Sequence, residues 1–258
     1  MSKPIEVNIE DGIGIITLNR PEKLNSLSFE LIEAFTLELE KLDKNKKVKV
    51  IIVSAEGKAF CAGGDLETMK NLSESNDKLD YMQKASGLTK TILSLDKYVV
   101  SAVHGFAAGA GFSLALASDF IVADSSAKFG LNFVHVGVIP DLGLMKLLSE
   151  RVPVAIAKEW ILSGKVISAE EAKNWGIINR ISEEDVLQEA IEFSQIILKG
   201  PQLSNKYVKQ MFNHTVNLNW DIVLNQENMI QTFLMQTEDY QEGLRAFYDK
   251  RDPHFNRI

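Results

Sequence analysis

Short apolar runs and longer amphipathic stretches alternate along the chain. Short apolar runs predict buried strands at residues 13–18, 49–54, 98–103 and 119–124, and the run at 98–103 is β-branched and free of breakers. Residues 127–130 predict a short extended piece. The stretches between them predict helices over residues 28–43, 66–72, 79–95 and 112–118. Ser28 is a favourable N-cap for the first of these helices. This alternation predicts an α/β fold.

The C-terminal third is predicted to be mostly helical. Ser168-Ala169-Glu170-Glu171 resembles a capping box, Asn174-Trp175-Gly176 ends the helix that it starts, and residues 177–181 predict one more strand. Residues 182–258 have the pattern of helices, interrupted at Gly200-Pro201 and near Asn217. We therefore expect a core over residues 1–200 and a helical region over residues 201–258.

Two loops of small residues directly follow predicted strands. One contains Gly63 and Gly64, and the other contains Gly105, Gly109 and Gly111. A strand, a turn without bulky side chains and a helix start leave backbone N–H groups free to face an anion. Close packing of a helix on a sheet would also require small residues. If the strands are neighbours, each loop could aim one N–H at the same oxygen, which would form an oxyanion hole for a thioester carbonyl.

Composition narrows the classes of protein. At 258 residues with 45% hydrophobic content, the chain can form one large domain, or one domain with a helical appendage. The net charge of −7 disfavours a nucleic-acid surface, and no apolar run reaches membrane-spanning length. The N-terminus lacks a signal-peptide core and Cys61 is the single cysteine, so we expect a cytoplasmic protein without an internal disulfide. No His or Cys pair has metal-ligand spacing, and we expect no metal.

The paired loops resemble those of a known superfamily. Phe60-Cys61-Ala62-Gly63-Gly64-Asp65-Leu66, followed about forty residues later by His104-Gly105-Phe106-Ala107-Ala108-Gly109-Ala110-Gly111, is similar to the crotonase superfamily of enoyl-CoA hydratases and isomerases. The resemblance extends from Leu18-Asn19-Arg20-Pro21 to Lys250-Arg251, and the pattern is closest to the isomerase branches. It implies a spiral of stacked β-β-α units with a C-terminal helical region that packs on neighbouring subunits, in a homotrimer or a dimer of trimers.

The resemblance also assigns roles to particular positions. It implies an acyl-CoA substrate, with coenzyme A as part of that substrate and no separate cofactor. It places the two oxyanion donors on the N–H groups of Gly64 and Ala110. The positions that it implies for contact with coenzyme A, of which the last two would reach the ligand of an adjacent subunit, are Lys23, Leu24, Ala62, Asp65, Leu66, Phe247 and Lys250.

The acid–base positions depart from the hydratase pattern. Hydratases of this family carry two glutamates, and the matching positions here hold Ser113 and Phe133. Neither side chain can activate water as a carboxylate does at neutral pH. We therefore do not expect a conventional hydratase.

One acid remains at a suitable position, Asp141 in the segment 136–145. Its position matches an acid used by several isomerase branches, which the resemblance implies as the catalytic base. The alternative is a helix N-cap, for which aspartate after Pro140 is a favoured choice. Apolar neighbours would keep the site dry and raise the pKa of Asp141, and we expect these to be Phe133, Val134, Val136 and Leu142.

A single carboxylate suits the shift of a Δ3 double bond to Δ2 by proton transfer, because this reaction needs no water. The alternatives are a hydratase-type reaction with unconventional residues, a ring-opening isomerisation of the phenylacetyl-CoA kind, and a non-catalytic acyl-CoA-binding protein. Residues 142–144 (Leu-Gly-Leu) depart from the small residue and two glycines usual in the ring-opening branch. The polar segment 71–80 is expected to be mobile over the acyl pocket.

Overall fold

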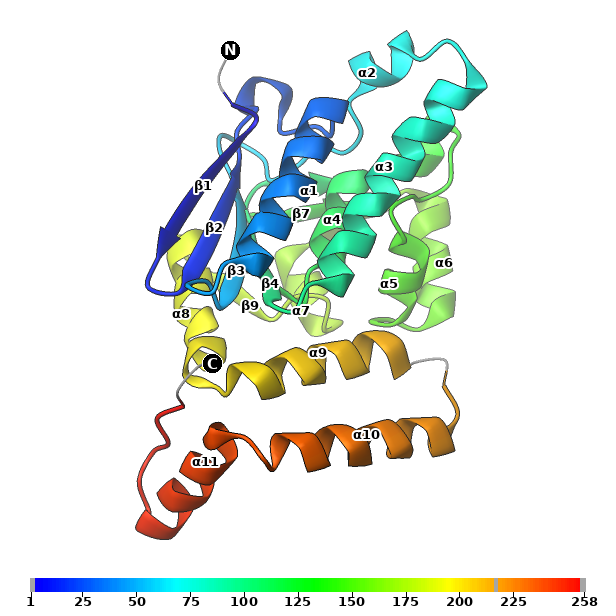
Figure 1. Cartoon of the computed structure of the whole chain (residues 1–258). Coiled ribbons are helices and arrows are strands. Elements are labelled where there is room, and N and C mark those ends of the chain that lie inside the picture. The colour runs from blue at the N-terminus through cyan, green and yellow to red at the C-terminus, as the bar shows by residue number, and fades with distance from the viewer. Residues whose placement is uncertain (1–2, 216–217, 256–258) are drawn as a thin grey trace.

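The computed structural model describes residues 3–215 and 218–255, and its centre is a six-stranded sheet (Figure 1). The first two strands are antiparallel, and the remaining neighbours are parallel. In sheet order the strands are β1 (Ile5–Glu10), β2 (Ile13–Leu18), β3 (Val50–Ala55), β4 (Tyr98–Val103), β6 (Phe120–Asp124) and β9 (Arg180–Ser182). The sheet therefore brings the carboxyl ends of β3 and β4 side by side. The predicted oxyanion hole requires this, because its two loops follow these two strands.

A second, three-stranded sheet lies beyond the end of β4. Its strands, in order, are β5 (Phe106–Ala108), β7 (Lys128–Gly130) and β8 (Val166–Ser168). Gly105 turns the chain from β4 into β5 at a φ of +55°. A Cβ at this position would lie 2.2 Å from the Lys58 carbonyl oxygen, so only glycine fits. The β4 loop is thus held against the β3 loop.

Helices cover both faces of the large sheet. They are α1 (Phe29–Lys44), α2 (Leu66–Asn71), α3 (Ser75–Ser94), α4 (Ala110–Ala117), α5 (Leu144–Ser149), α6 (Val154–Ser163), α7 (Ala169–Asn174) and α8 (Val186–Lys199), with short 3₁₀ turns η1 (Pro21–Lys23) and η2 (Asn132–Val136). On β3, Ile51 and Val53 face the layer that contains α1, α3 and α4, whereas Val50 and Ile52 face α8. Burial on both faces explains the uninterrupted apolar runs of the parallel strands.

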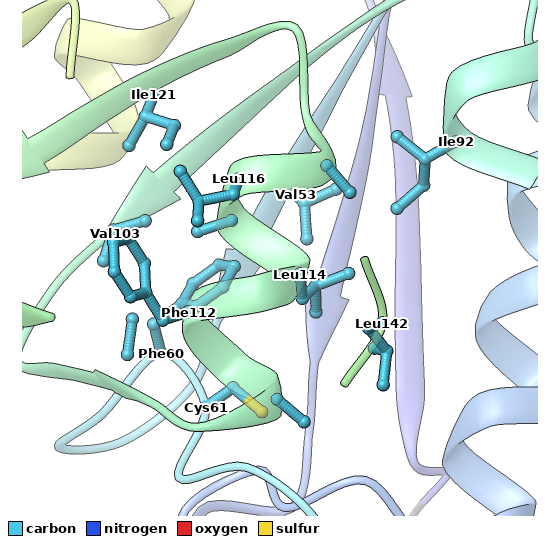
Figure 2. Close-up of a cluster of buried hydrophobic side chains, with 14 of the residues drawn as sticks. Val53, Phe60, Cys61, Ile92, Val103, Phe112, Leu114, Leu116, Ile121 and Leu142 are labelled. Carbon is cyan, nitrogen blue, oxygen red and sulfur yellow. The ribbon is translucent and has the colours of Figure 1, made fainter. Parts of the chain in front are cut away.

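Helix α4 is buried along its whole length. Figure 2 shows Phe112, Leu114 and Leu116 of this helix among side chains from the sheet, such as Val53 and Ile121. A helix surrounded by core has no need of a polar face. It therefore forms a rigid support for the loop that precedes it.

The last helices, α9 (Gln202–Thr215), α10 (Trp220–Leu234) and α11 (Glu238–Asp249), lie together below the core in Figure 1. The buried ammonium of Lys209 on α9 donates to Asp119 at 2.8 Å and to two carbonyls of the core. Large apolar side chains remain exposed on these helices, among them Phe212, Trp220, Met229, Phe247 and Tyr248. The predicted break near Asn217 lies outside the described residues.

Several sequence predictions are confirmed and others need correction. Ser28 and Ser168 cap α1 and α7 by accepting backbone N–H groups. The segment 71–80 is not a loop throughout, because α3 begins at Ser75 and its first turns are polar where they face solvent. The final strand is β9, and the apolar pair at 177–178 is buried without strand pairing. No helix among the described residues is long and apolar enough to cross a membrane.

Candidate active site

The two small-residue loops are joined by backbone hydrogen bonds. The Cys61 N–H donates to the Phe106 carbonyl at 3.1 Å, and the Ala108 N–H donates to the Cys61 carbonyl at 2.9 Å. Gly111 lies so close that a Cβ there would be 2.1 Å from the Cys61 oxygen. The loops after β3 and β4 therefore form one rigid unit, and glycine at 111 is a steric requirement.

The backbone of Leu27 determines where the Gly64 N–H points. The Leu27 N–H donates to the Gly63 carbonyl at 2.8 Å, and the Leu27 carbonyl accepts from the Asp65 N–H at 3.2 Å. In this parallel bridge both bonds are made by the residues that flank Gly64, so the polar groups of Gly64 face the opposite side. Within the described residues the Gly64 N–H donates to no protein acceptor.

The second donor is the first N–H of α4. Ala110 begins this helix, and an N–H in the first turn has no intrahelical partner. Across the described part of the chain, the Ala110 N–H has no protein acceptor. A Cβ at Gly63 would lie 3.4 Å from the Ala110 nitrogen, so the two loops touch beside the two donors.

Both donors line a pocket of about 590 Å³, together with Asp141. Of the other positions selected from sequence, the pocket is lined by Lys23, Ala62, Asp65 and Leu66. Leu24 is not among the lining residues, although its carbonyl accepts the Ala62 N–H at 2.9 Å. Phe247 and Lys250 belong to the α11 region, at the far end of the C-terminal helices in Figure 1. The role of these positions in binding coenzyme A remains a prediction.

The Asp65 carboxylate forms hydrogen bonds and an ion pair that hold the local structure together. It accepts the N–H groups of Glu67 and Thr68 at the start of α2, forms an ion pair with Arg20 at 2.9 Å, and accepts the Ser26 hydroxyl. Burial alone would raise the pKa of Asp65, but these contacts outweigh burial and hold the pKa below its usual value. Asp65 therefore fixes the loop that carries Gly64.

The carboxylate of Asp141 has fewer hydrogen-bond partners than that of Asp65. Its Oδ1 is buried and has no hydrogen-bond partner among the described residues. Burial raises the pKa of Asp141 to about 6, and its own backbone N–H and the Ser113 hydroxyl reduce this effect only in part. The N-cap interpretation of Asp141 is wrong, because α5 begins after Gly143 and has no side-chain cap.

At the two positions where hydratases carry glutamates, this chain has Ser113 and Phe133. Ser113 is buried and its hydroxyl donates to the Gly109 carbonyl at 3.3 Å. Phe133 is buried against the pocket, with its ring 3.8 Å from where a Cβ on Gly109 would be. The other carboxylate that lines the pocket with Asp65 and Asp141 is Glu67, which pairs with Lys23 at 2.8 Å. Asp141 is thus the pocket carboxylate with an uncommitted oxygen.

Comparison with known proteins agrees with this geometry. A family described as "Enoyl-CoA hydratase/isomerase" matches residues 8–257. The chain is 31% identical over 257 residues to a trans-2-decenoyl-(acyl-carrier-protein) isomerase of Streptococcus mutans, covering 98% of both chains. It is 32% identical over 253 residues to a 1,2-epoxyphenylacetyl-CoA isomerase of Escherichia coli, covering 96% of both.

A solved structure confirms the expected architecture. The crystal structure of an enoyl-CoA hydratase from Polaromonas sp. JS666 superposes with a TM-score of 0.94 at 30% identity, over 98% of this chain and 99% of that one. The match covers the sheets and the C-terminal helices alike, so the expected crotonase-like fold is confirmed. The relatives carry the names of both isomerases and hydratases. The chain belongs to the enoyl-CoA hydratase/isomerase family.

Proposed function

We propose that this protein shifts the double bond of a 3-enoyl thioester to the Δ2 position, with Asp141 as its single acid–base group. One observation carries the proposal. One oxygen of the Asp141 carboxylate is buried without a hydrogen-bond partner among the described residues. It belongs to the same pocket as the N–H groups of Gly64 and Ala110, which donate to no acceptor in the described part of the chain. A base and two anion-stabilising donors around one cavity are the groups that enolate chemistry requires.

The donors stabilise the charge that develops on the substrate. When a proton leaves the carbon next to a thioester carbonyl, negative charge moves to the carbonyl oxygen. Two preset N–H groups stabilise this oxyanion without reorganising, and the loss of one such donor typically costs about 3 kcal/mol. Both donors are main-chain groups on loops held by the core, which keeps them in place before the substrate binds.

The carboxylate moves one proton between two carbons. Asp141 takes a proton from C2, the C2–H electrons form the dienolate, and Asp141 returns the proton to C4 as the C3–C4 double bond becomes C2–C3. Substrate and product are isomers, so no water enters the balance. A pKa of about 6 leaves the carboxylate ionised at neutral pH and makes it a stronger base than a free aspartate.

The surroundings favour isomerisation over hydration. Phe133, Val136 and Val138 line the pocket with apolar surface. Neither Ser113 nor Phe133 offers a second carboxylate to activate water, as hydration by the two-glutamate route would need. The relative from Streptococcus mutans is named as an isomerase of a trans-2-decenoyl group, and this name supports an isomerisation of an enoyl group here.

The proposed substrate is an acyl-CoA. Lys23, Ala62 and Leu66 are exposed residues that line the pocket, and we propose that they contact the coenzyme A moiety. Phe247 and Lys250 would reach that ligand from a neighbouring copy of the chain. The exposed apolar side chains on α9, α10 and α11 support such an assembly, proposed as a homotrimer or a dimer of trimers.

The test compares the wild-type protein with Asp141→Asn on a 3-enoyl-CoA and on crotonyl-CoA, followed by thioester ultraviolet absorbance. We expect isomerisation by the wild type, no hydration, and a loss of about 10³-fold in kcat in the variant. The matched control is Asp11→Asn, which changes an exposed aspartate in the turn between β1 and β2, outside the pocket lining, and should leave turnover unchanged.

Three other results would overturn the proposal. Hydration of crotonyl-CoA would mean a hydratase-type reaction with unconventional residues. Turnover that survives Asp141→Asn would mean another base. Binding of both esters without turnover would leave a ring-opening isomerisation, which the similarity to the Escherichia coli relative favours, or a non-catalytic binding role.

A further inference from the structure

Helix α3 carries two buried hydroxyl groups that bond outside the helix. The Tyr81 hydroxyl donates to the Leu27 carbonyl at 2.5 Å, and the Thr89 hydroxyl donates to the Leu142 carbonyl at 3.0 Å. Both side chains are almost inaccessible, with exposed fractions of 3% and 6%. By contrast, Ser86 on the same helix donates to the Met82 carbonyl of its own preceding turn.

The Tyr81 bond is directed at the segment that orients the first oxyanion donor. Leu27 is the residue whose backbone bonds flank Gly64 and turn its N–H toward the pocket. The Tyr81 oxygen lies 3.4 Å from where a Cβ on Gly64 would be. Burial raises the pKa of Tyr81 to about 12, so the hydroxyl remains a donor throughout the working pH range.

The Thr89 bond is directed at the residue that follows the proposed base. Leu142 has a φ of +48°, in the left-handed region that a leucine seldom adopts, and Gly143 follows at +81°. Such a conformation persists only where the surroundings impose it. Here the Leu142 side chain is buried in the core, and its carbonyl is held by Thr89. This fixed turn sets the direction in which Asp141 enters the pocket.

The helix between the two hydroxyls is anchored in the core. Ala85, Leu88 and Ile92 of α3 are buried with the residues of α1 and α4. The ring of Tyr81 also packs edge-on against Phe29 of α1, with ring centroids 5.1 Å apart. Tyr81 and Thr89 therefore project from one rigid element toward two separate loops.

We propose that Tyr81 and Thr89 are positioning residues, through which α3 sets the distance between the oxyanion donor on Gly64 and the carboxylate of Asp141. The inference rests on the proposed function of these two groups. Neither side chain is among the residues that line the pocket, and each donates to a carbonyl of a neighbouring segment. Small errors in the relative position of reacting groups cost orders of magnitude in rate, so a shared support of this kind has a measurable consequence.

The experiment uses two variants that keep the packing and remove one hydroxyl each. In Tyr81→Phe and Thr89→Val we expect kcat for the 3-enoyl-CoA to fall about tenfold, with KM nearly unchanged, because the ground-state contacts remain. Ser86→Ala is the matched control, since it removes a hydroxyl that bonds only within α3. Thr89→Ser restores the hydroxyl and should recover most of the lost rate.

Two spectroscopic measurements separate positioning from general loosening. The infrared carbonyl band of a bound acyl-CoA, labelled with carbon-13 at the thioester carbon, reports polarisation by the donors. Tyr81→Phe should move this band toward its position in free solution, and Thr89→Val should leave it in place. Carbon-13 NMR of labelled aspartate reports the titration of Asp141, which Thr89→Val should shift and Tyr81→Phe should not.

These signals do not depend on turnover. A wild-type protein that binds the ester without isomerising it would contradict the proposed function, while the band and the titration would still test the role of α3. Equal effects of both variants on both signals, or wild-type values in both, would overturn the inference. So would a loss of rate in Thr89→Val that Thr89→Ser does not recover.

Discussion

Two aspartates that line one pocket show how differently the fold surrounds the same side chain. Asp65 accepts hydrogen bonds from two backbone N–H groups and from Ser26, and it pairs with Arg20 at 2.9 Å. Asp141 has a buried oxygen without a partner among the described residues. The pKa of Asp65 lies below its usual value, and the pKa of Asp141 rises to about 6.

The difference separates a carboxylate that holds a loop in place from the carboxylate that we propose as the base. A carboxylate that is saturated with donors is stabilised in its charged form and is a weak base. A carboxylate whose desolvation is compensated only in part costs folding free energy and is a stronger base. The contacts of Asp65 thus hold the loop that carries Gly64, whereas the desolvated oxygen of Asp141 costs folding free energy at the position of the proposed base.

The largest effect on the free energy of unfolding should come from removing the Asp65 carboxylate, which has several hydrogen-bond partners. Asp65→Ala leaves the Arg20 guanidinium, whose side chain is 18% exposed, without its carboxylate and removes the cap of α2. We expect a loss of about 3 kcal/mol in the free energy of unfolding, measured by urea denaturation at pH 7. Because the pKa of Asp65 is depressed, this contribution is fully present above its unfolded pKa near 4 and is lost as the pH falls through the folded pKa. A variant as stable as wild type at pH 7 would contradict the structural role.

Removing the charge of Asp141 should have the opposite effect and should stabilise the fold. The folded pKa of Asp141 exceeds the value of 3.8 for a free aspartate, so the ionised form destabilises the fold above pH 6. Asp141→Asn should therefore be more stable than wild type by at most about 2–3 kcal/mol at pH 8. The advantage should shrink as the pH falls from 6 to 4, where the native side chain becomes protonated. Destabilisation of Asp141→Asn at pH 8 would mean that the carboxylate has a partner.

The smallest effect on stability is expected for the exposed ion pair at the pocket, in contrast to the buried pair of Asp65. Lys23 pairs with Glu67 at 2.8 Å, but both side chains are largely exposed. Lys23→Met should leave the free energy of unfolding unchanged within error, since such pairs contribute little. If Lys23 contacts coenzyme A, the KM for the thioester should rise several-fold at low salt and much less at high salt, because screening weakens the contact. A KM that is unchanged at low salt would remove Lys23 from the binding site.

Local features of the fold were predictable from sequence because local residues determine them. The apolar runs at β2, β3, β4 and β6 and the caps Ser28 and Ser168 are of this kind. Polarity was misleading at residues 75–80, where polar residues indicate an exposed helix face and not a loop. Apolar residues were misleading at Ile177 and Ile178, which are buried but outside β9.

The site was predictable only as far as its residues could be named. The family resemblance brought Gly64, Ala110 and Asp141 together, and the pocket contains all three. The condition of each carboxylate depends on partners far away in sequence, such as Arg20 for Asp65, and no local pattern reveals it. Tyr81 and Thr89 gave no signal either, because a hydroxyl in an amphipathic helix has the same pattern whether or not it reaches another segment.

The most direct test of the account is the pH dependence of kcat/KM for isomerisation of a 3-enoyl-CoA by the wild-type protein, measured from pH 4.5 to 8. If an ionised, desolvated Asp141 is the base, kcat/KM should rise with pH, reach half its maximum at an apparent pKa near 6, and level off above that pH. A rate that is independent of pH down to 4.5, or that falls only near the pKa of a free carboxylate, would contradict the account.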